Sequence, residues 1–266
     1  MAATIAVLSQ KGGTGKTTAV RTLTDLLRRI DLRVLAVDLD PQGNLSDYLD
    51  IDPDATPTIG DVLAGRARTA EAVHGDVIPA NLGLAEAELM LGGKMGRELT
   101  LRKALREIAD GYDVILIDCP PALGLLTVNA LVAADYALLS AEAQYFALQG
   151  VEQALQVIEL AHDTLNPSLE WLGVVLNIAD MRTRHSREAY DSLREHFGEK
   201  LFEPTIRSSI AYAESAERAV SILDYRPDLG LDYLLVGDEL LRRLGMTKAR
   251  RRLAPMLATS RAQRSA

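Results

Sequence analysis

The sequence contains a single cysteine, Cys119, among its 266 residues. One cysteine excludes an internal disulfide framework and a metal site built from several cysteines of one chain. No His–Asp pair lies near Cys119 in the sequence, so we interpret it as a small buried residue rather than a nucleophile. The scarcity of cysteine fits a reducing, cytoplasmic setting.

Long apolar runs are also missing, and none is long enough to cross a bilayer. The first apolar segment, Thr4–Leu8, begins so near the N-terminus that we expect no signal peptide before it. No internal repeat is visible. The length and the 48% content of hydrophobic residues suit one large α/β domain with at most a small appendage.

The net charge of −8 argues against a protein that coats DNA with a generally basic surface. The charge is uneven, however, because the segment from Arg242 to the end holds eight basic residues and no acidic residue, which leaves −16 on the rest of the chain. A basic patch on an acidic body remains compatible with phosphate binding. We expect a single domain over residues 1–246 and a basic, flexible tail over residues 247–266, since the tail contains Pro255 and ends in Ser and Ala.

A glycine-rich loop follows Thr4–Leu8 and precedes apolar residues at helical spacing from Ala19 to Ile30. Glycines let several N–H groups face one point, and the helix N-terminus adds partial positive charge there, so this context is what a phosphate-binding loop requires. Lys16 can reach the β- and γ-phosphates of a nucleotide, and the Thr17 hydroxyl can bind magnesium. The residues predicted to cradle the nucleotide are Lys11, Gly12, Gly13, Thr14, Gly15, Lys16, Thr17 and Thr18.

The loop departs from the usual formula at one position, because Gln10 stands where a glycine is expected. A second lysine, Lys11, opens the loop. The alternative interpretation is a plain glycine turn with two solvated lysines. We disfavour it because the strand, the loop and the helix all fit phosphate binding.

Two further apolar strands end in aspartate. Arg33–Asp38 leads into a segment that contains Asp40, and Tyr112–Asp118 is followed by Cys119 and two prolines. Carboxylates at the C-terminal ends of parallel strands point into the ligand crevice of the sheet. Asp40 is therefore a candidate for orienting an attacking water and for the metal, although a strand-ending turn would explain it too. Asp118 is suited to hold Mg²⁺ through a bound water.

Strands alternate with helices along the whole chain. This pattern predicts an α/β, doubly wound, mostly parallel sheet with helices on both faces. Asn177, at the end of the strand Trp171–Asn177, is either an adenine contact or a turn residue. We interpret Tyr145 and Phe146 as core or interface residues rather than as a base-stacking platform.

A stripe of arginines follows Asn177. Arg184, Arg187 and Arg194 lie at helical spacing, with Asp191 among them. Charged stripes of this kind are usually solvated helix faces, but arginines can also contact nucleic-acid phosphates. The sequence leaves both interpretations open.

Three segments resemble the signature motifs of the ParA/MinD family of ATPases, whose deviant phosphate loop carries the same extra lysine. These segments are Lys11–Thr17, Asp38–Asn44 and Ile117–Pro121. The stretches Gly124–Leu131 and Glu142–Leu148 also match, and the resemblance extends from Thr4 to about Leu244. The chain looks most like the compact, chromosome-type (Soj-like) partition ATPases, which lack the N-terminal DNA-reading domain of some plasmid relatives.

This resemblance implies a phosphate-loop NTPase of the SIMIBI type that hydrolyses ATP slowly with Mg²⁺. It implies a homodimer bridged by ATP, in which Lys11 reaches the partner's nucleotide and Asp40 supports the attacking water. It further implies non-specific binding to double-stranded DNA on the nucleoid, and hydrolysis stimulated by a ParB-like centromere-binding protein. The expected outcome is segregation of plasmid or chromosomal DNA, with no role for a membrane.

Two departures from the family affect the expected binding residues. Close relatives have Ile-Pro-Arg-Asn-Val-Arg near Ile206, whereas here Arg207 stands at the adenine-contacting proline. Base recognition by Ile206 and Arg207 is therefore expected to differ. Ser208 and Ala211 replace the two arginines, one of which contacts DNA in the family. Arg182 matches the other DNA-contact arginine of the family. DNA contacts are expected from Arg182, Arg184, Arg187 and Arg207, or from the basic tail.

Four other functions share parts of this pattern. A MinD-like ATPase that acts on membranes should end in an amphipathic helix, which the clustered arginines and Pro255 disfavour. An iron–sulfur reductase with the same loop needs two cysteines per subunit. A small-molecule synthetase would need a substrate pocket, for which no signature is visible. A ParA-family positioning ATPase could also carry a protein assembly instead of DNA.

Overall fold

A parallel β-sheet forms the centre of the molecule. The structure is a computed structural model that describes residues 2–265. Within these residues the sheet has six strands in the order β3-β2-β4-β1-β5-β6, all parallel, which confirms the predicted fold class. The strands are β1 (Ala3–Leu8), β2 (Val34–Asp38), β3 (Val77–Ile78), β4 (Val114–Asp118), β5 (Tyr136–Glu142) and β6 (Glu170–Asn177).

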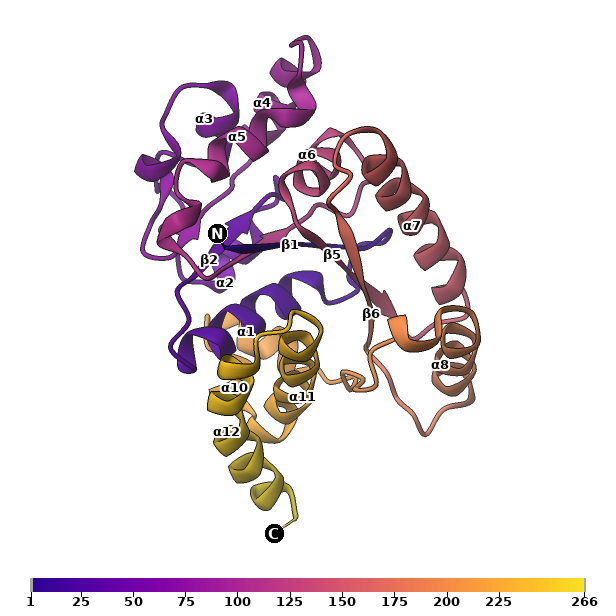
Figure 1. The fold of residues 1–266 in the computed structure, drawn as a ribbon. Coiled ribbons are helices and arrows are strands. Elements are labelled where there is room, and N and C mark those ends of the chain that lie inside the picture. The colour runs from indigo at the N-terminus through magenta and orange to yellow at the C-terminus, as the bar shows by residue number, and fades with distance from the viewer. Residues whose placement is uncertain (1, 266) are drawn as a thin grey trace.

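Helices cover both faces of the sheet (Figure 1). One face carries α1 (Lys16–Arg29), α2 (Asn44–Tyr48), α9 (Ala211–Glu217), α10 (Ile222–Tyr225), α11 (Pro227–Arg243) and α12 (Thr247–Ser265). The other face carries α3 (Ile59–Ala64), α4 (Gly83–Gly92), α5 (Thr100–Arg106), α6 (Leu125–Ala133), α7 (Ala147–Thr164) and α8 (Arg184–Phe197). Two buried apolar layers result, one on each side of the sheet.

The central strands supply both layers by alternation. In β1, Ile5 and Val7 face the layer of α1 and α11, whereas Ala6 and Leu8 face the layer of α6 and α7. Successive side chains of a strand point to opposite faces, so a strand buried on both sides reads as a continuous apolar run. This explains why the runs at residues 4–8 and 114–117 identified strands so clearly.

The strand register brings the chemically active residues to one edge of the sheet. Asp38 of β2 pairs with Asp118 of β4, and Val7 of β1 pairs with that same Asp118. The loop after β1 therefore starts beside Asp118, with Asp38 on the next strand. The strand order also reverses at β1, which lies between β4 and β5, and ligands of doubly wound sheets bind at such a switch point.

The prediction of a flexible C-terminal tail is wrong for the residues that the structure describes. Residues 247–265 form the helix α12, which packs against α11. Ala249, Leu253 and Leu257 are spaced four residues apart and are buried in the same apolar layer as α1 and α11. Arg252 adds a hydrogen bond of 3.1 Å to the carbonyl of Ile30 at the end of α1. The apolar stripe outweighs the basic composition, and the helix continues through Pro255.

We expect Leu253→Ala to destabilise the protein by roughly 2–4 kcal/mol, because it removes a fully buried side chain and leaves a cavity. Urea unfolding followed by circular dichroism measures the change. Arg251→Ala, on the exposed side of the same helix, should change the free energy of unfolding by less than about 0.5 kcal/mol. Equal unfolding midpoints for wild type and Leu253→Ala would show that α12 contributes nothing to the core.

Candidate functional site

The glycine loop after β1 leads directly into α1. Gly13 and Gly15 have positive φ angles of 75° and 80°, a conformation that glycine adopts without a steric penalty. A Cβ atom on Gly15 would also lie 3.2 Å from the side chain of Asn177. The next residue, Lys16, is the first of α1 and is 6% exposed. The predicted order of strand, loop and helix is thus present, with the loop amides at a helix N-terminus.

A chain of buried hydrogen bonds fixes the path of this loop. The Asn177 amide donates to the Ser140 hydroxyl (2.7 Å), which donates to the carbonyl of Thr14 (2.8 Å). The Thr14 hydroxyl donates to Ser9 (3.0 Å), which donates to the carbonyl of Lys11 (2.6 Å). Each of the three hydroxyls donates one hydrogen bond, and those of Ser140 and Ser9 also accept one, so none of these buried hydroxyls is unpaired. It ties the loop to β5 and β6.

Two buried carboxylates lie at the ends of adjacent strands, and that of Asp118 contacts the start of α1. Asp118 accepts a hydrogen bond of 2.7 Å from the Thr17 hydroxyl through one oxygen, while its other oxygen is buried without a hydrogen-bond partner. Asp38 accepts bonds from the amide and hydroxyl of Ser46 (2.9 and 2.8 Å). Burial, and then the neighbouring Asp38 charge, raise the pKa of Asp118 to about 8. Burial also raises the pKa of Asp38 to about 6.

These groups fit a magnesium ion held together with a nucleotide. Mg²⁺ prefers hard oxygen ligands and keeps several waters, and the Thr17 hydroxyl and the unpartnered Asp118 oxygen are donors of that kind. Within residues 2–265, no group of three or more His, Cys, Asp or Glu side chains could hold a metal ion. The remaining ligands would therefore have to come from phosphate and water oxygens.

Asp40 lies in the turn just after β2. Its carboxylate accepts a hydrogen bond of 3.0 Å from the amide of Gln42, and its own amide donates to Asp38. Its negative charge also contributes to the raised pKa of Asp118. The turn that the sequence offered as an alternative explanation is therefore present, and the proposed roles of Asp40 toward water and metal stay predictions.

A cleft of about 660 Å³ opens beside the loop. Its size is in the range of small-molecule and cofactor sites. Its walls include Gly13, Gly15, Lys16, Thr17 and Thr18 of the loop and helix α1, together with Asn177, Ile206 and Arg207 from the end of β6 and the segment before α9. The structure thus brings the predicted base-contact residues beside the predicted phosphate-contact residues.

Several walls of this cleft were not identified from the sequence. Tyr48 of α2 and Tyr212 of α9 line it, as do Asn44 and Asp47. Tyr48 lies in a stretch of the sequence without a recognisable motif. Tyr212 lies close after Arg207 in the sequence, which is the one signal that could have suggested it. Tyr48 and Tyr212 come from elements far apart in the sequence, so only the tertiary structure brings both to this cleft.

Arg207 is held inside the cleft rather than displayed on the surface. Its guanidinium donates to Asp232 of α11 at 2.7 Å and also to the carbonyl of Asp228. Asp232 is buried, so the ion pair offsets the charge of Arg207 locally. The structure therefore separates Arg207 from the other arginines predicted to contact DNA.

Those other arginines gather at the start of α8. The Arg182 side chain is 91% exposed and forms two bonds of 2.9 Å to Asp180, and these bonds lower the pKa of Asp180 to about 2. Arg184 pairs with Glu188, and Arg187 donates to the carbonyls of Met181 and Arg182. Exposed ion pairs contribute little stability, so phosphate groups can compete for these side chains.

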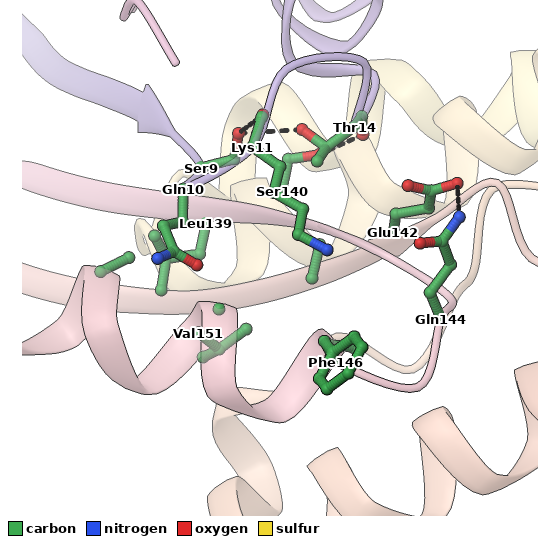
Figure 2. Close-up of a pocket in the computed structure, with 14 residues that line it drawn as sticks. Ser9, Gln10, Lys11, Thr14, Leu139, Ser140, Glu142, Gln144, Phe146 and Val151 are labelled. Atoms are coloured by element: carbon green, nitrogen blue, oxygen red, sulfur yellow. Dashed lines mark hydrogen bonds between the residues drawn. The ribbon is translucent and has the colours of Figure 1, made fainter. Parts of the chain in front are cut away.

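The two lysines of the loop point into different hollows. Lys16 lines the cleft described above, whereas Lys11 is exposed and lines a separate small hollow with Gln10, Glu142 and Phe146 (Figure 2). Gln10 is accommodated because Gly150 of α7 faces it: a Cβ atom there would lie 3.3 Å from the Gln10 oxygen. Cys119 is fully buried and burial raises the pKa of its thiol, as expected for a small core residue.

Comparisons with known proteins agree with these motifs. Residues 2–171 match the family model described as an AAA domain. The chain is 37% identical over 259 residues to the chromosome partitioning protein ParA of Myxococcus xanthus, covering 94% of this chain and 92% of that protein. It is 37% identical over 230 residues to the sporulation initiation inhibitor protein Soj of Bacillus subtilis, covering 84% of this chain and 91% of that protein.

A solved structure is similar as well. It is described as cobyrinic acid a,c-diamide synthase from Mycobacterium smegmatis with bound ADP and magnesium. The TM-score is 0.75 at 36% identity, and the match covers 82% of this chain and 93% of that one. No helix within the described residues is long and apolar enough to span a membrane.

We expect the stability of the ligand-free protein to fall as the pH rises from 6 to 8. The unfolded chain ionises Asp118 near pH 4, whereas the folded protein retains the proton up to about pH 8, so the stabilising contribution of the protonated group is lost as pH rises through that value. The expected loss is roughly 1–3 kcal/mol. Urea unfolding without nucleotide or Mg²⁺ at both pH values measures it.

Asp118→Asn should flatten this pH dependence, because the amide does not ionise and still accepts the hydrogen bond from Thr17. Asp54→Asn is the matched control, since Asp54 is exposed and its replacement should leave the slope unchanged. The same pH slope in Asp118→Asn and wild type would contradict the assignment to Asp118.

Proposed function

The chain belongs to the ParA/MinD-type family of partition ATPases, and we propose that it hydrolyses ATP slowly with Mg²⁺ to switch a homodimer on and off double-stranded DNA. The observation that carries this proposal is the meeting of three groups at one edge of the sheet. These are the loop amides at the start of α1, the buried Lys16, and the hydrogen-bonded pair of Thr17 and Asp118.

The phosphates of ATP would occupy the loop from Gly12 to Thr18. The backbone N–H groups and the α1 N-terminus would bind the phosphate oxygens, and Lys16 would neutralise charge that builds up during transfer of the γ-phosphoryl group. Thr17 and Asp118 would hold Mg²⁺, whose charge screens the phosphates. Because Asp118 sits in register beside Asp38, the charge of Asp38 disfavours ionisation of Asp118, and a bound cation would relieve that repulsion.

The base of ATP would lie in the cleft between the loop and α9. Ile206 offers an apolar wall, and the planar guanidinium of Arg207, which Asp232 holds at the cleft, would give the base a surface to stack on. Asn177 already donates its amide to Ser140. We therefore assign Asn177 chiefly to positioning the loop, with its oxygen available to the nucleotide. Asp40 would orient the attacking water.

Dimerisation would place Lys11 on the partner's nucleotide. This assignment is supported by the direction of the Lys11 side chain, which leaves the cleft of its own chain to Lys16. A lysine supplied by a second subunit ties charge stabilisation in the transition state to the assembled state. Closed two-fold dimers use the same patch twice, so each chain would both give and receive one lysine.

DNA would bind through phosphate contacts from Arg182, Arg184 and Arg187 at the start of α8. Lys248 and Arg251 on the exposed side of α12 add positive charge without an ion pair among the described residues. We assign Arg207 to the nucleotide cleft instead, because Asp232 offsets its charge. Contacts to phosphates bind duplexes of any sequence and weaken with salt.

The cellular role that follows is segregation of plasmid or chromosomal DNA over the nucleoid, in the cytoplasm, with a ParB-like protein that stimulates hydrolysis. A MinD-like action on membranes is disfavoured by one observation. The apolar residues of the last helix, Leu253 and Leu257, are buried against the body and are not available to lipid.

We expect the two lysines of the loop to separate binding from turnover. Lys16→Ala should abolish ATP binding, because it removes the buried cation at the phosphate site. Lys11→Ala should keep ATP binding within about twofold and lose hydrolysis and ATP-dependent dimerisation. Fluorescent-nucleotide titration, phosphate release and light scattering measure the three properties. Normal hydrolysis by Lys11→Ala would remove Lys11 from the catalytic residues.

We expect Asp40→Ala to bind ATP and to accumulate as an ATP-bound dimer, because the carboxylate that orients the water is missing. Size-exclusion chromatography after incubation with ATP and Mg²⁺ measures the dimer, and phosphate release measures turnover. Asp54→Ala provides an exposed acidic control. Turnover at the wild-type rate would exclude Asp40 from catalysis.

We expect binding to an arbitrary duplex only with ATP and Mg²⁺, and weaker binding as salt rises. Arg182→Glu should weaken it about tenfold and lower the slope against log salt by about 1. The matched control is Arg68→Glu, another exposed arginine that pairs with a nearby acid, Glu71. Fluorescence anisotropy without nucleotide, with ADP and with ATP gives the comparison.

A paired variant, Lys248→Glu with Arg251→Glu, tests the contribution of α12 without removing the helix. Unchanged affinity in this variant and in Arg182→Glu would contradict the proposed DNA surface. If wild-type protein hydrolyses ATP but binds no duplex under any condition, the family ATPase acts on another surface.

A further inference from the structure

Phe146 is an exposed aromatic residue beside the phosphate loop. Together with Tyr145 it forms the turn between β5 and α7, and the two residues are 56% and 80% exposed. Their rings meet edge to face at a centroid distance of 5.0 Å. Neither belongs to the core, so of the two interpretations given by the sequence the core is wrong for this pair. Burial in the core therefore does not explain these two aromatic residues beside the phosphate loop.

The ring of Phe146 lies under the ammonium of Lys11. The Lys11 nitrogen is 5.6 Å from the ring centroid, within the range of a cation–π interaction. Figure 2 shows the Lys11 side chain extending from the loop toward this ring. The backbone of Lys11 is fixed separately, because its carbonyl accepts the 2.6 Å hydrogen bond from Ser9. Both ends of Lys11 are therefore restrained.

The acidic residue in the same hollow, Glu142, does not bind the Lys11 ammonium. Glu142 lines the hollow, but its carboxylate accepts a hydrogen bond of 2.6 Å from the amide of Gln144. No ion pair joins Lys11 to Glu142 within the part of the chain that the structure describes. The aromatic face is thus the group that holds the ammonium.

We propose that Phe146 is a positioning residue for Lys11. The Phe146 ring holds the lysine out of the cleft of its own chain and directs it to the face where a second copy of the chain docks. This inference rests on the proposed function, since it takes Lys11 as the residue that crosses to the partner's nucleotide. Phe146 does not touch the reacting atoms.

The arrangement has a clear energetic purpose. A free lysine has many rotamers, and ordering it when the dimer forms costs conformational entropy. Restraint by an aromatic ring places much of that cost in the free protomer. It also keeps a second positive charge out of the cleft that must accept the partner's lysine. In a two-fold dimer both sites gain, because each ring prepares one lysine.

The first experiment uses the free protein without nucleotide. Lys11 is acetylated with a limiting amount of acetic anhydride, and the rate is read by mass spectrometry relative to the exposed Lys103 of the same chain. We expect Phe146→Leu to raise the relative rate about two- to fivefold, as expected for loss of an exposed cation–π contact. Phe146→Tyr, which keeps the aromatic face, and Glu142→Gln should match wild type. An unchanged rate in Phe146→Leu would overturn the proposal.

The second experiment measures ATP turnover and nucleotide affinity. Phe146→Leu should lower kcat about two- to fivefold and leave the Kd for a fluorescent ATP analogue unchanged. Phe146→Tyr should have the kcat of the wild-type protein. Equal losses in both variants, or a parallel loss of nucleotide affinity, would show a merely structural role and overturn the proposal.

The two experiments distinguish failure of the proposed function from failure of the positioning role of Phe146. If the wild-type protein shows no turnover, the proposed function fails, whereas the labelling rates still decide whether Phe146 holds Lys11. If labelling is unchanged but turnover and DNA binding are normal, the proposed function stands and the positioning role of Phe146 does not.

Discussion

The molecule depends on two aspartates that lie in register at the end of adjacent buried strands. Asp38 and Asp118 are almost completely buried, burial raises the pKa of both, and the charge of Asp38 makes ionisation of Asp118 harder still. A carboxyl group placed there makes the ligand-free protein less stable as the pH rises toward its raised pKa. The arrangement is stabilised when a cation arrives, which is how a site built to respond to magnesium and nucleotide would behave.

The phosphate loop is rigid for a reason that extends across the sheet. The hydrogen-bond chain from Asn177 through Ser140, Thr14 and Ser9 joins the end of β6 to the backbone of Lys11. Because every hydroxyl in this chain of hydrogen bonds is buried and paired, the loop cannot shift without leaving a buried polar group unpaired. Preorganised amides of this kind stabilise phosphate charge without rearranging during the reaction.

The arginines of this protein differ in whether their acidic partners are buried or exposed. Arg207 is fixed to Asp232 at the cleft, whereas Arg182 and its neighbours are paired only at the exposed surface. The basic C-terminal segment is a helix whose apolar stripe is buried and whose Lys248 and Arg251 face solvent. A protein with net charge −8 can thus present a local positive surface, and salt would weaken that surface more than the buried pair.

The sequence by itself determined the parallel sheet, the phosphate loop and the aspartates, because buried strands read as apolar runs and the glycine loop requires its residues in consecutive order. It could not determine that Leu253 and Leu257 bury the last helix, since four-residue spacing in a basic segment has meaning only once α11 lies beside it. It could not separate Arg207 from Arg182, because the ion pair with Asp232 joins residues far apart in the chain. The contact of Lys11 with Phe146 also spans more than a hundred residues, and only the tertiary structure decided it.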